Sequence, residues 1–217
     1  MHTFIEKGYE FEPGLHYVGF LSEGSLGKTL MDQITGGQVE WAPMEDVFDR
    51  CSIGFGEDIK FYDILKGGGD EWKNYLKDQF PDEHEAVDKY FEVINGMGKL
   101  SQIIIYLVLK VLPLWASWIM AKSGIVHLFT LAFRTEFGER SAYDFICEYT
   151  KNKDLRTLMT YASADLGTVA SQTHFPLYAL VLNHYKTDGG FYPIGGASEL
   201  SMALVPIIER AGGRVMV

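Results

Sequence analysis

The chain contains 217 residues, of which 47% are hydrophobic and 14% aromatic, enough to bury a core in one large domain or two small ones. Its 19 Lys and Arg residues against 29 Asp and Glu residues give a formal net charge of −10, which argues against a nucleic-acid-binding protein because such proteins present a basic face. The two cysteines, Cys51 and Cys147, form no C-x-x-C pair, so we expect neither a disulfide framework nor a cysteine zinc site.

The first third of the chain is predicted to be rich in short strands. Residues 3–6 and 9–12 flank Lys7 and Gly8, which form a turn signal, and further strand-like runs occupy 39–42, 51–55 and 59–64. From Asp70 onward the pattern changes to that of helices, which we expect at 70–79, 82–97, 100–121, 141–150, 152–166 and 172–186. The last four residues, 214–217, are predicted to begin a strand.

This order predicts an α/β chain, of the mixed α+β type, in three stretches. Residues 1–66 form a strand-rich region, residues 67–186 a helical region, and residues 187–217 a glycine turn followed by a helix and a strand. A strand-like segment stands at each terminus without a turn or a partner, a pattern that fits both an internal piece of a longer protein and a domain that ends on strands.

Several glycine motifs resemble phosphate-binding loops without matching them. The G-x-G runs at 54–56 and 67–69 lack the third glycine of the dinucleotide-binding fingerprint. The run GKT at 27–29 matches the end of a P-loop, but Ser22 stands where that motif requires its first glycine. We therefore expect a surface turn at 27–29 rather than a phosphate-binding loop.

The segment GGFYPIGGASELSMALVPIIERAGG at 189–213 combines two glycine pairs with an amphipathic helix. Its apolar residues recur at helical spacing, at Leu200, Leu204, Ile207, Ile208 and Ala211. Gly195 and Gly196 would let a ligand approach the first amides of this helix, where the helix dipole favours an anion. The same glycines would also serve simply to form the turn, and the sequence leaves both interpretations open.

The six histidines do not indicate a metal site. None belongs to an H-x-x-x-H or H-E-x-x-H motif, and the carboxylates near them lack ligand spacing, so we expect no bound metal. His184, just before the glycine segment, is the best candidate for a catalytic proton donor. The competing interpretation is that His184 is a half-buried polar residue without a catalytic role.

Residues 103–121 (IIIYLVLKVLPLWASWIMA) form an apolar run close to the ~20 residues that span a bilayer. Lys110 near its middle costs about 2.5–3.5 kcal/mol on the insertion scale, and Pro113 weakens a helix. Three interpretations remain, namely a helix that contacts the membrane surface, a buried core helix and a full span. In the first, Tyr106, Trp115 and Trp118 lie at the level of the lipid headgroups.

Four segments, in order along the chain, resemble the retinol saturase branch of the phytoene desaturase and carotenoid isomerase flavoproteins. They are HTFIEKGYEFEPGLHYVG at 2–19, GGQVEWAP at 36–43, NHYKTDGGFYPIGGASEL at 183–200 and IIERAGG at 207–213. The resemblance implies part of a Rossmann-type FAD/NAD(P)-binding flavoprotein, mainly its substrate domain. It also implies that most FAD contacts lie in segments missing from this chain, so we expect the 217 residues alone to be inactive and to retain no FAD.

The resemblance further implies the reduction of a polyene double bond, most simply the saturation of all-trans-retinol at C13–C14. It implies a retinoid or carotenoid substrate, NAD or NADP as possible electron source, and association with the endoplasmic reticulum membrane. Two alternatives stay open. One is a carotenoid isomerase or desaturase of the same fold, and the other is a non-catalytic, membrane-associated lipid-binding module.

Particular residues can be carried over from the resemblance. Glu12, Gly14 and His16 match the family's F-D-x-G-x-H stretch, with glutamate in place of the usual aspartate, and are implied to lie near the flavin ring. Gly195 and Gly196 match its P-x-G-G turn, which returns to the FAD domain.

Overall fold

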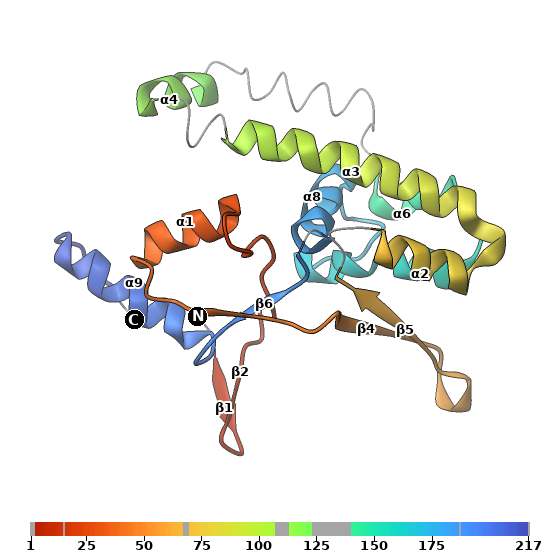
Figure 1. Cartoon of the computed structure of the whole chain (residues 1–217), viewed down its shortest axis with the longest axis horizontal. Coiled ribbons are helices and arrows are strands. Elements are labelled where there is room, and N and C mark those ends of the chain that lie inside the picture. The colour runs from red at the N-terminus through yellow and green to blue at the C-terminus, as the bar shows by residue number, and fades with distance from the viewer. Residues whose placement is uncertain are drawn as a thin grey trace. The chain divides into compact units, whose positions relative to one another are not determined.

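The chain folds as a mixed α+β protein, which confirms the predicted class at this level (Figure 1). The computed structural model describes residues 3–14, 16–66, 70–106, 113–122, 140–186 and 188–216. The chain divides into two compact units. Unit 1 comprises Met1–Arg50, Asp63–Glu71 and His184–Val217, and unit 2 comprises Cys51–Tyr62 and Trp72–Asn183.

Unit 1 is built from short antiparallel strand pairs and two helices. β1 (Phe4–Glu6) pairs with β2 (Tyr9–Phe11), and β3 (Trp41–Pro43) pairs with β6 (Phe191–Pro193). The helices are α1 (Leu26–Thr35) and α9 (Ser198–Arg210), which pack against each other. A third pair, formed by β4 (Val47–Ile53) and β5 (Lys60–Leu65), continues from unit 1 into unit 2.

The hairpin of β1 and β2 confirms the strand prediction for the start of the chain. Its two-residue turn has positive φ at both positions, 52° at Lys7 and 86° at Gly8. Positive φ at both central residues is the conformation of a type I′ turn, whose twist matches that of the flanking strands. The turn signal in the sequence therefore placed this hairpin correctly.

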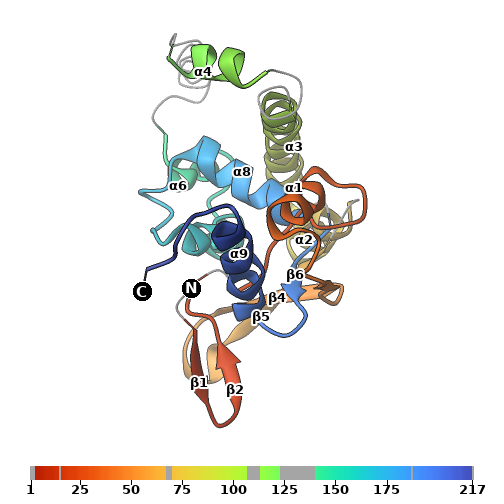
Figure 2. The same cartoon turned by 90° about the vertical axis from the view of Figure 1, so that its left-hand side faces the viewer.

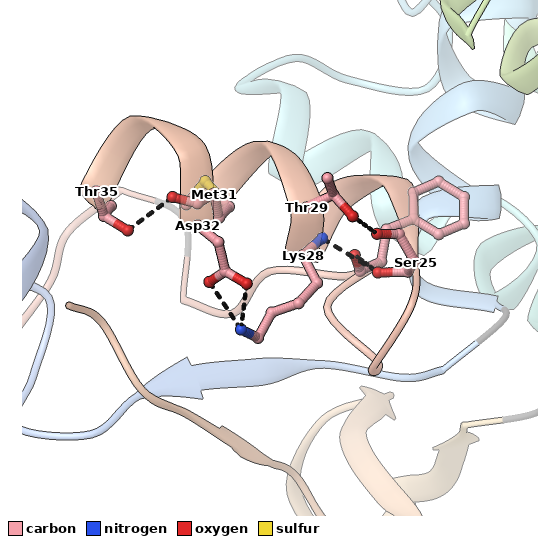
Figure 3. A network of polar contacts seen from close by, with 7 residues as sticks. Ser25, Lys28, Thr29, Met31, Asp32 and Thr35 are labelled. Carbon is pink, nitrogen blue, oxygen red and sulfur yellow. Dashed lines mark hydrogen bonds and ion pairs between the residues drawn. The ribbon is translucent and has the colours of Figure 1, made fainter. Parts of the chain in front are cut away.

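Helix α1 lies in the region that the sequence predicts to be strand-rich, and it corrects that prediction. The Ser25 hydroxyl accepts a hydrogen bond from the Lys28 amide at 3.1 Å and caps the helix, and Gly36 ends it with φ of 65°. Lys28 forms an ion pair with Asp32 one turn later, at 2.7 Å (Figure 3). The GKT run thus lies in the first turn of α1, not in the surface turn that the sequence predicted, and its lysine is engaged by a carboxylate.

The remaining helices lie wholly or mostly in unit 2. They are α2 (Glu71–Gln79), α3 (His84–Tyr106), α4 (Leu114–Lys122), α6 (Ala142–Cys147), α7 (Lys153–Leu158) and α8 (Phe175–Lys186). Short 3-10 turns occupy Gly56–Asp58, Pro81–Glu83 and Tyr161–Leu166. The end of α8, from His184, belongs to unit 1.

Several boundaries differ from the prediction. The single helix expected at 152–166 is divided into α7, which ends at Leu158, and the 3-10 turn at Tyr161–Leu166. The helices expected at 82–97 and 100–121 are replaced by α3, which is continuous to Tyr106, and α4, which begins after Pro113; residues 107–112 lie outside the described part. The strand expected at 214–217 is also wrong for the described residues 214–216, which form no strand. A strand needs a partner for its backbone groups, and sequence pattern alone does not supply one.

The core of unit 2 contains a buried polar network. The hydroxyls of Tyr90 on α3 and Tyr178 on α8 lie 2.9 Å apart, and both donate to the carbonyl of Met159. Burial raises the pKa of both phenols, so they stay protonated and can donate. Asn183 adds a second link, since its side-chain amide donates to the Ile94 carbonyl on α3. These bonds fix α3 and α8 against each other where unpaired polar groups would be costly.

We expect Tyr178→Phe to lower the free energy of unfolding by about 1 kcal/mol, because it removes a buried hydrogen-bond donor while keeping the ring. Tyr143→Phe is the matched control, because it removes the same hydroxyl from a tyrosine that is exposed to solvent on α6. Urea denaturation measures both changes. Equal effects of the two substitutions would show that the buried network does not stabilise unit 2.

Candidate functional site

Two segments far apart in the chain lie antiparallel in unit 1. At one end, Val18 and Phe191 exchange two backbone hydrogen bonds of 2.9 and 2.8 Å. At the other end, the Glu10 carboxylate accepts hydrogen bonds from the Ser198 hydroxyl at 2.8 Å and from the Ser198 amide at 3.2 Å. Both views show α9 beside the base of the β1–β2 hairpin (Figures 1 and 2). The stretch after β2 therefore lies next to the glycine turn before α9.

The glycine turn is accounted for by its own backbone. Gly195 and Gly196 both have φ of +98°, a backbone conformation that residues other than glycine rarely adopt. A Cβ at Gly196 would lie 3.3 Å from the Glu10 carboxylate, and one at Gly195 would lie 2.8 Å from the Glu199 side chain. These contacts favour the interpretation that the two glycines form the turn.

Glu10 occupies the place where an external anion would bind. Helix α9 has Ala197 at its N-cap position and therefore no side-chain cap of its own. The carboxylate of Glu10 supplies the missing acceptor at the positive end of the helix. No local sequence pattern indicates this role of Glu10, because its partner Ser198 lies 188 residues away in the chain.

Glu12 carries a hydrogen-bond acceptor that is left open. Its Oε1 accepts a hydrogen bond from the Gly14 amide at 3.1 Å. Its Oε2 is buried and has no hydrogen-bond partner among the described residues. Gly14 and His16 lie exposed on the same stretch. A buried carboxylate oxygen without a donor is costly, so Glu12 is the residue of this stretch best suited to accept a hydrogen bond from a ligand.

His184 serves as a hydrogen-bond acceptor in the fold. Its Nε2 accepts from the Gly19 amide at 2.9 Å, which assigns the neutral imidazole with the proton on Nδ1. A Cβ at Gly19 would lie 1.8 Å from the His184 carbonyl oxygen, so only glycine fits there. Burial lowers the pKa of His184, partly opposed by the charge of Asp188. The catalytic role of His184 stays a prediction beside this structural one.

The apolar run ends in a helix with exposed tryptophans. On α4, Trp115 is 68% and Trp118 61% exposed, and the Lys122 ammonium lies 4.5 Å from the Trp118 ring centre. Tyr106 is the last residue of α3, and its side chain lies outside the description. Within the described residues, no helix is both long and apolar enough to cross a bilayer.

Two further kinds of site to consider in the described part of the chain are a metal site and a pocket that could hold an apolar substrate. No three His, Cys, Asp or Glu side chains gather there in a metal-binding arrangement. A groove of about 600 Å³ in unit 2 is lined mostly by carboxylates, at Asp82, Glu83, Glu85, Asp88, Glu92 and Glu148. Lys73 and Lys77 lower the pKa of Asp88 to about 2 by hydrogen bonding, so that carboxylate stays charged. Such a lining is unsuited to an apolar polyene.

Comparison with known proteins finds several similar proteins that share one name. No family model matches the chain. It is 36% identical over 216 residues to the all-trans-retinol 13,14-reductase of Danio rerio, covering 100% of this chain and 35% of that protein. It is 34% identical to the protein of the same name from Rattus norvegicus, covering 99% and 34%. A further Danio rerio relative, named an inactive all-trans-retinol 13,14-reductase, is 32% identical, covering 99% and 34%.

The chain is thus an α+β protein with a glycine turn joined to a carboxylate-bearing stretch. Over its whole length it is similar to proteins named all-trans-retinol 13,14-reductase, which confirms the resemblance identified from the sequence motifs. The chain spans about a third of the length of the curated relatives it matches.

We expect the free energy of unfolding to decrease as the pH is lowered, because of His184. Its pKa in the folded state is lowered below 6.5, so the unfolded chain binds the proton more readily. The contribution is fully present above about pH 6.5 and is lost as the pH falls below that value. Unfolding in urea at about pH 7.5 and about pH 5 measures it.

The control substitutions separate His184 from other groups. His184→Gln keeps a side-chain acceptor for the Gly19 amide but cannot titrate, so it should remove this part of the pH dependence. His16→Asn, at an exposed histidine, should leave it in place. An unchanged pH dependence in His184→Gln would contradict the assignment.

Proposed function

We propose that the polypeptide containing these 217 residues is an FAD-dependent oxidoreductase that saturates the C13–C14 double bond of all-trans-retinol. The observation that carries the proposal is the similarity of the whole chain to proteins named for this reaction. The hydrogen bond between Glu10 and Ser198 supports it, because it brings the residues next to Glu12 and those next to the Gly195–Gly196 turn together in unit 1, and the sequence resemblance implies that both segments contact the flavin.

The described residues fit the neutral part of FAD better than its pyrophosphate. The open Oε2 of Glu12 can accept a hydrogen bond from a ribityl hydroxyl or from the ring imide, and the exposed backbone at Gly14 and Gly195 allows close approach. The α9 N-terminus is already filled by Glu10, so it does not fit a phosphate. We therefore propose that a Rossmann-type domain outside these residues holds the pyrophosphate and most of the cofactor.

The redox chemistry would belong to the cofactor, because a bound reduced flavin would supply the hydride for one alkene carbon. In this chain, the Glu12 carboxylate orients the cofactor by accepting a hydrogen bond from it. The Gly14 amide holds that carboxylate in place. The Nε2 of His184 is already engaged by Gly19, so His184 could donate a proton from that atom only after releasing the amide.

The experiment that tests the proposal is a product assay with the complete polypeptide, FAD, a chemical reductant and all-trans-retinol. We expect a product heavier by one pair of hydrogen atoms, detected by mass spectrometry. In parallel assays with a carotenoid, a mass-neutral rearrangement would instead support the isomerase alternative, and loss of a hydrogen pair, with an electron acceptor added in place of the reductant, would support the desaturase. Retinol that binds but is recovered unchanged would overturn the enzymatic proposal. It would favour a lipid-binding module, or a protein that is inactive as the name of the second Danio rerio relative states.

We also propose that α4 contacts a membrane surface, as suits an enzyme whose apolar substrate resides in the bilayer, with the endoplasmic reticulum membrane as the expected one. The support is the exposure of Trp115 and Trp118 next to Lys122, since tryptophans and lysines with this arrangement favour the interface between lipid and water.

Substituting Trp118→Ser should weaken co-sedimentation with phosphatidylcholine vesicles by about tenfold, because a large apolar side chain no longer enters the interface. Tyr143→Ser, at an exposed aromatic residue on α6, is the control and should bind as the unsubstituted protein does. Equal binding of all three proteins would contradict a membrane role for α4.

A further inference from the structure

The β1–β2 hairpin presents two different faces. Its register pairs Phe4 with Phe11, Ile5 with Glu10 and Glu6 with Tyr9, and side chains of successive pairs alternate between the faces. Glu10 is tied to Ser198 on α9, so its face is anchored to unit 1. The opposite face carries Glu6 next to the turn and three aromatic residues, which we call the aromatic face: Phe4, Tyr9 and Phe11.

The aromatic face is uncovered within the described part of the chain. Phe4 is 51%, Tyr9 71% and Phe11 46% exposed. The rings of Phe4 and Phe11 stack with centres 5.2 Å apart. Three neighbouring exposed aromatic residues form an apolar patch of the kind that marks an interaction surface.

Both long edges of the hairpin are also open. Among the described strands, β1 and β2 pair only with each other, and the hairpin projects from the rest of unit 1 in both views (Figures 1 and 2). Glu6 and Tyr9 flank the two-residue turn and form the hydrogen-bonded pair, so Ile5 and Glu10 direct their backbone groups outward. An isolated two-stranded hairpin is marginally stable in water, and neither strand contains the lysine or proline that commonly protects an edge.

We propose that the hairpin is the docking site for an extended apolar segment of the same polypeptide, which adds a strand to one edge and covers the aromatic face. The chain spans 35% of the Danio rerio relative, so a protein of that length carries ample further polypeptide. Strand addition suits this surface because backbone hydrogen bonds provide the attraction and the aromatic side chains provide the selectivity.

A contact within one molecule fits this surface better than a second copy. A stable interface between separate proteins buries about 800 Å² on each partner. A fully buried aromatic side chain contributes about 150–250 Å², and less than half of the Phe11 surface is still exposed. The three aromatic side chains therefore offer far less area than the roughly 800 Å² that each partner of a stable interface buries. A segment of the same polypeptide needs less area, because its association entropy is reduced by the covalent connection.

The test measures hydrogen exchange of the hairpin amides in the complete polypeptide and in this chain alone. We expect the Ile5 or Glu10 amide to exchange at least about tenfold more slowly in the complete polypeptide. Tyr9→Thr keeps a strand-forming residue but removes the ring, and in the complete polypeptide it should reduce this protection by about tenfold. Val169→Ser, at an exposed apolar residue of unit 2, is the control.

Three results would overturn the proposal. They are hairpin amides that exchange as fast in the complete polypeptide as in the chain alone, a protection that Tyr9→Thr does not change, and a dimer of this chain alone that Tyr9→Thr dissociates in the ultracentrifuge. The proposal goes beyond the redox activity and does not depend on it. Because neither flavin nor retinol is measured, failure here leaves the proposed function untouched, and a failed product assay leaves this proposal untouched.

Discussion

The Glu10 carboxylate at the N-terminus of α9 is the contact on which the arrangement of unit 1 depends. A helix begins with amides that have no partner within the helix and with a positive dipole end, and the local sequence of α9 provides no side chain to satisfy them. Glu10 provides that acceptor from β2. Together with the Val18–Phe191 pair, it fixes the antiparallel direction of two segments from opposite ends of the chain.

This arrangement determines which ligand chemistry the site can support. With the helix end already satisfied, the glycine turn is not a phosphate cradle, although its position before a helix invites that interpretation. The open group is instead the Oε2 of Glu12, an acceptor that fits a hydroxyl or imide donor. The proposed FAD contact therefore uses the uncharged part of the cofactor, and the proposed hairpin docking places additional polypeptide on the other side of the same β2 strand.

Local signals allowed the sequence to predict much of this. The Lys7–Gly8 turn identified the first hairpin, and the glycine segment identified α9 and its preceding turn, because each depends on residues close in the chain. Helix α1 was missed although Ser25 and Gly36 mark its ends, since the surrounding strand-like runs dominated the prediction. The role of Glu10 was out of reach, because it depends on a contact 188 residues away. The family resemblance, carried by several motifs in order, did not need that contact.

The central claim is that Glu10 and Ser198 stabilise the fold as a pair, and a double-mutant cycle tests it most directly. Glu10→Ala, Ser198→Ala and the double substitution are compared by their free energies of unfolding in urea. We expect the sum of the two single losses to exceed the loss in the double variant by about 1 kcal/mol, the size of a typical side-chain hydrogen bond. Additive losses, within about 0.3 kcal/mol, would contradict it.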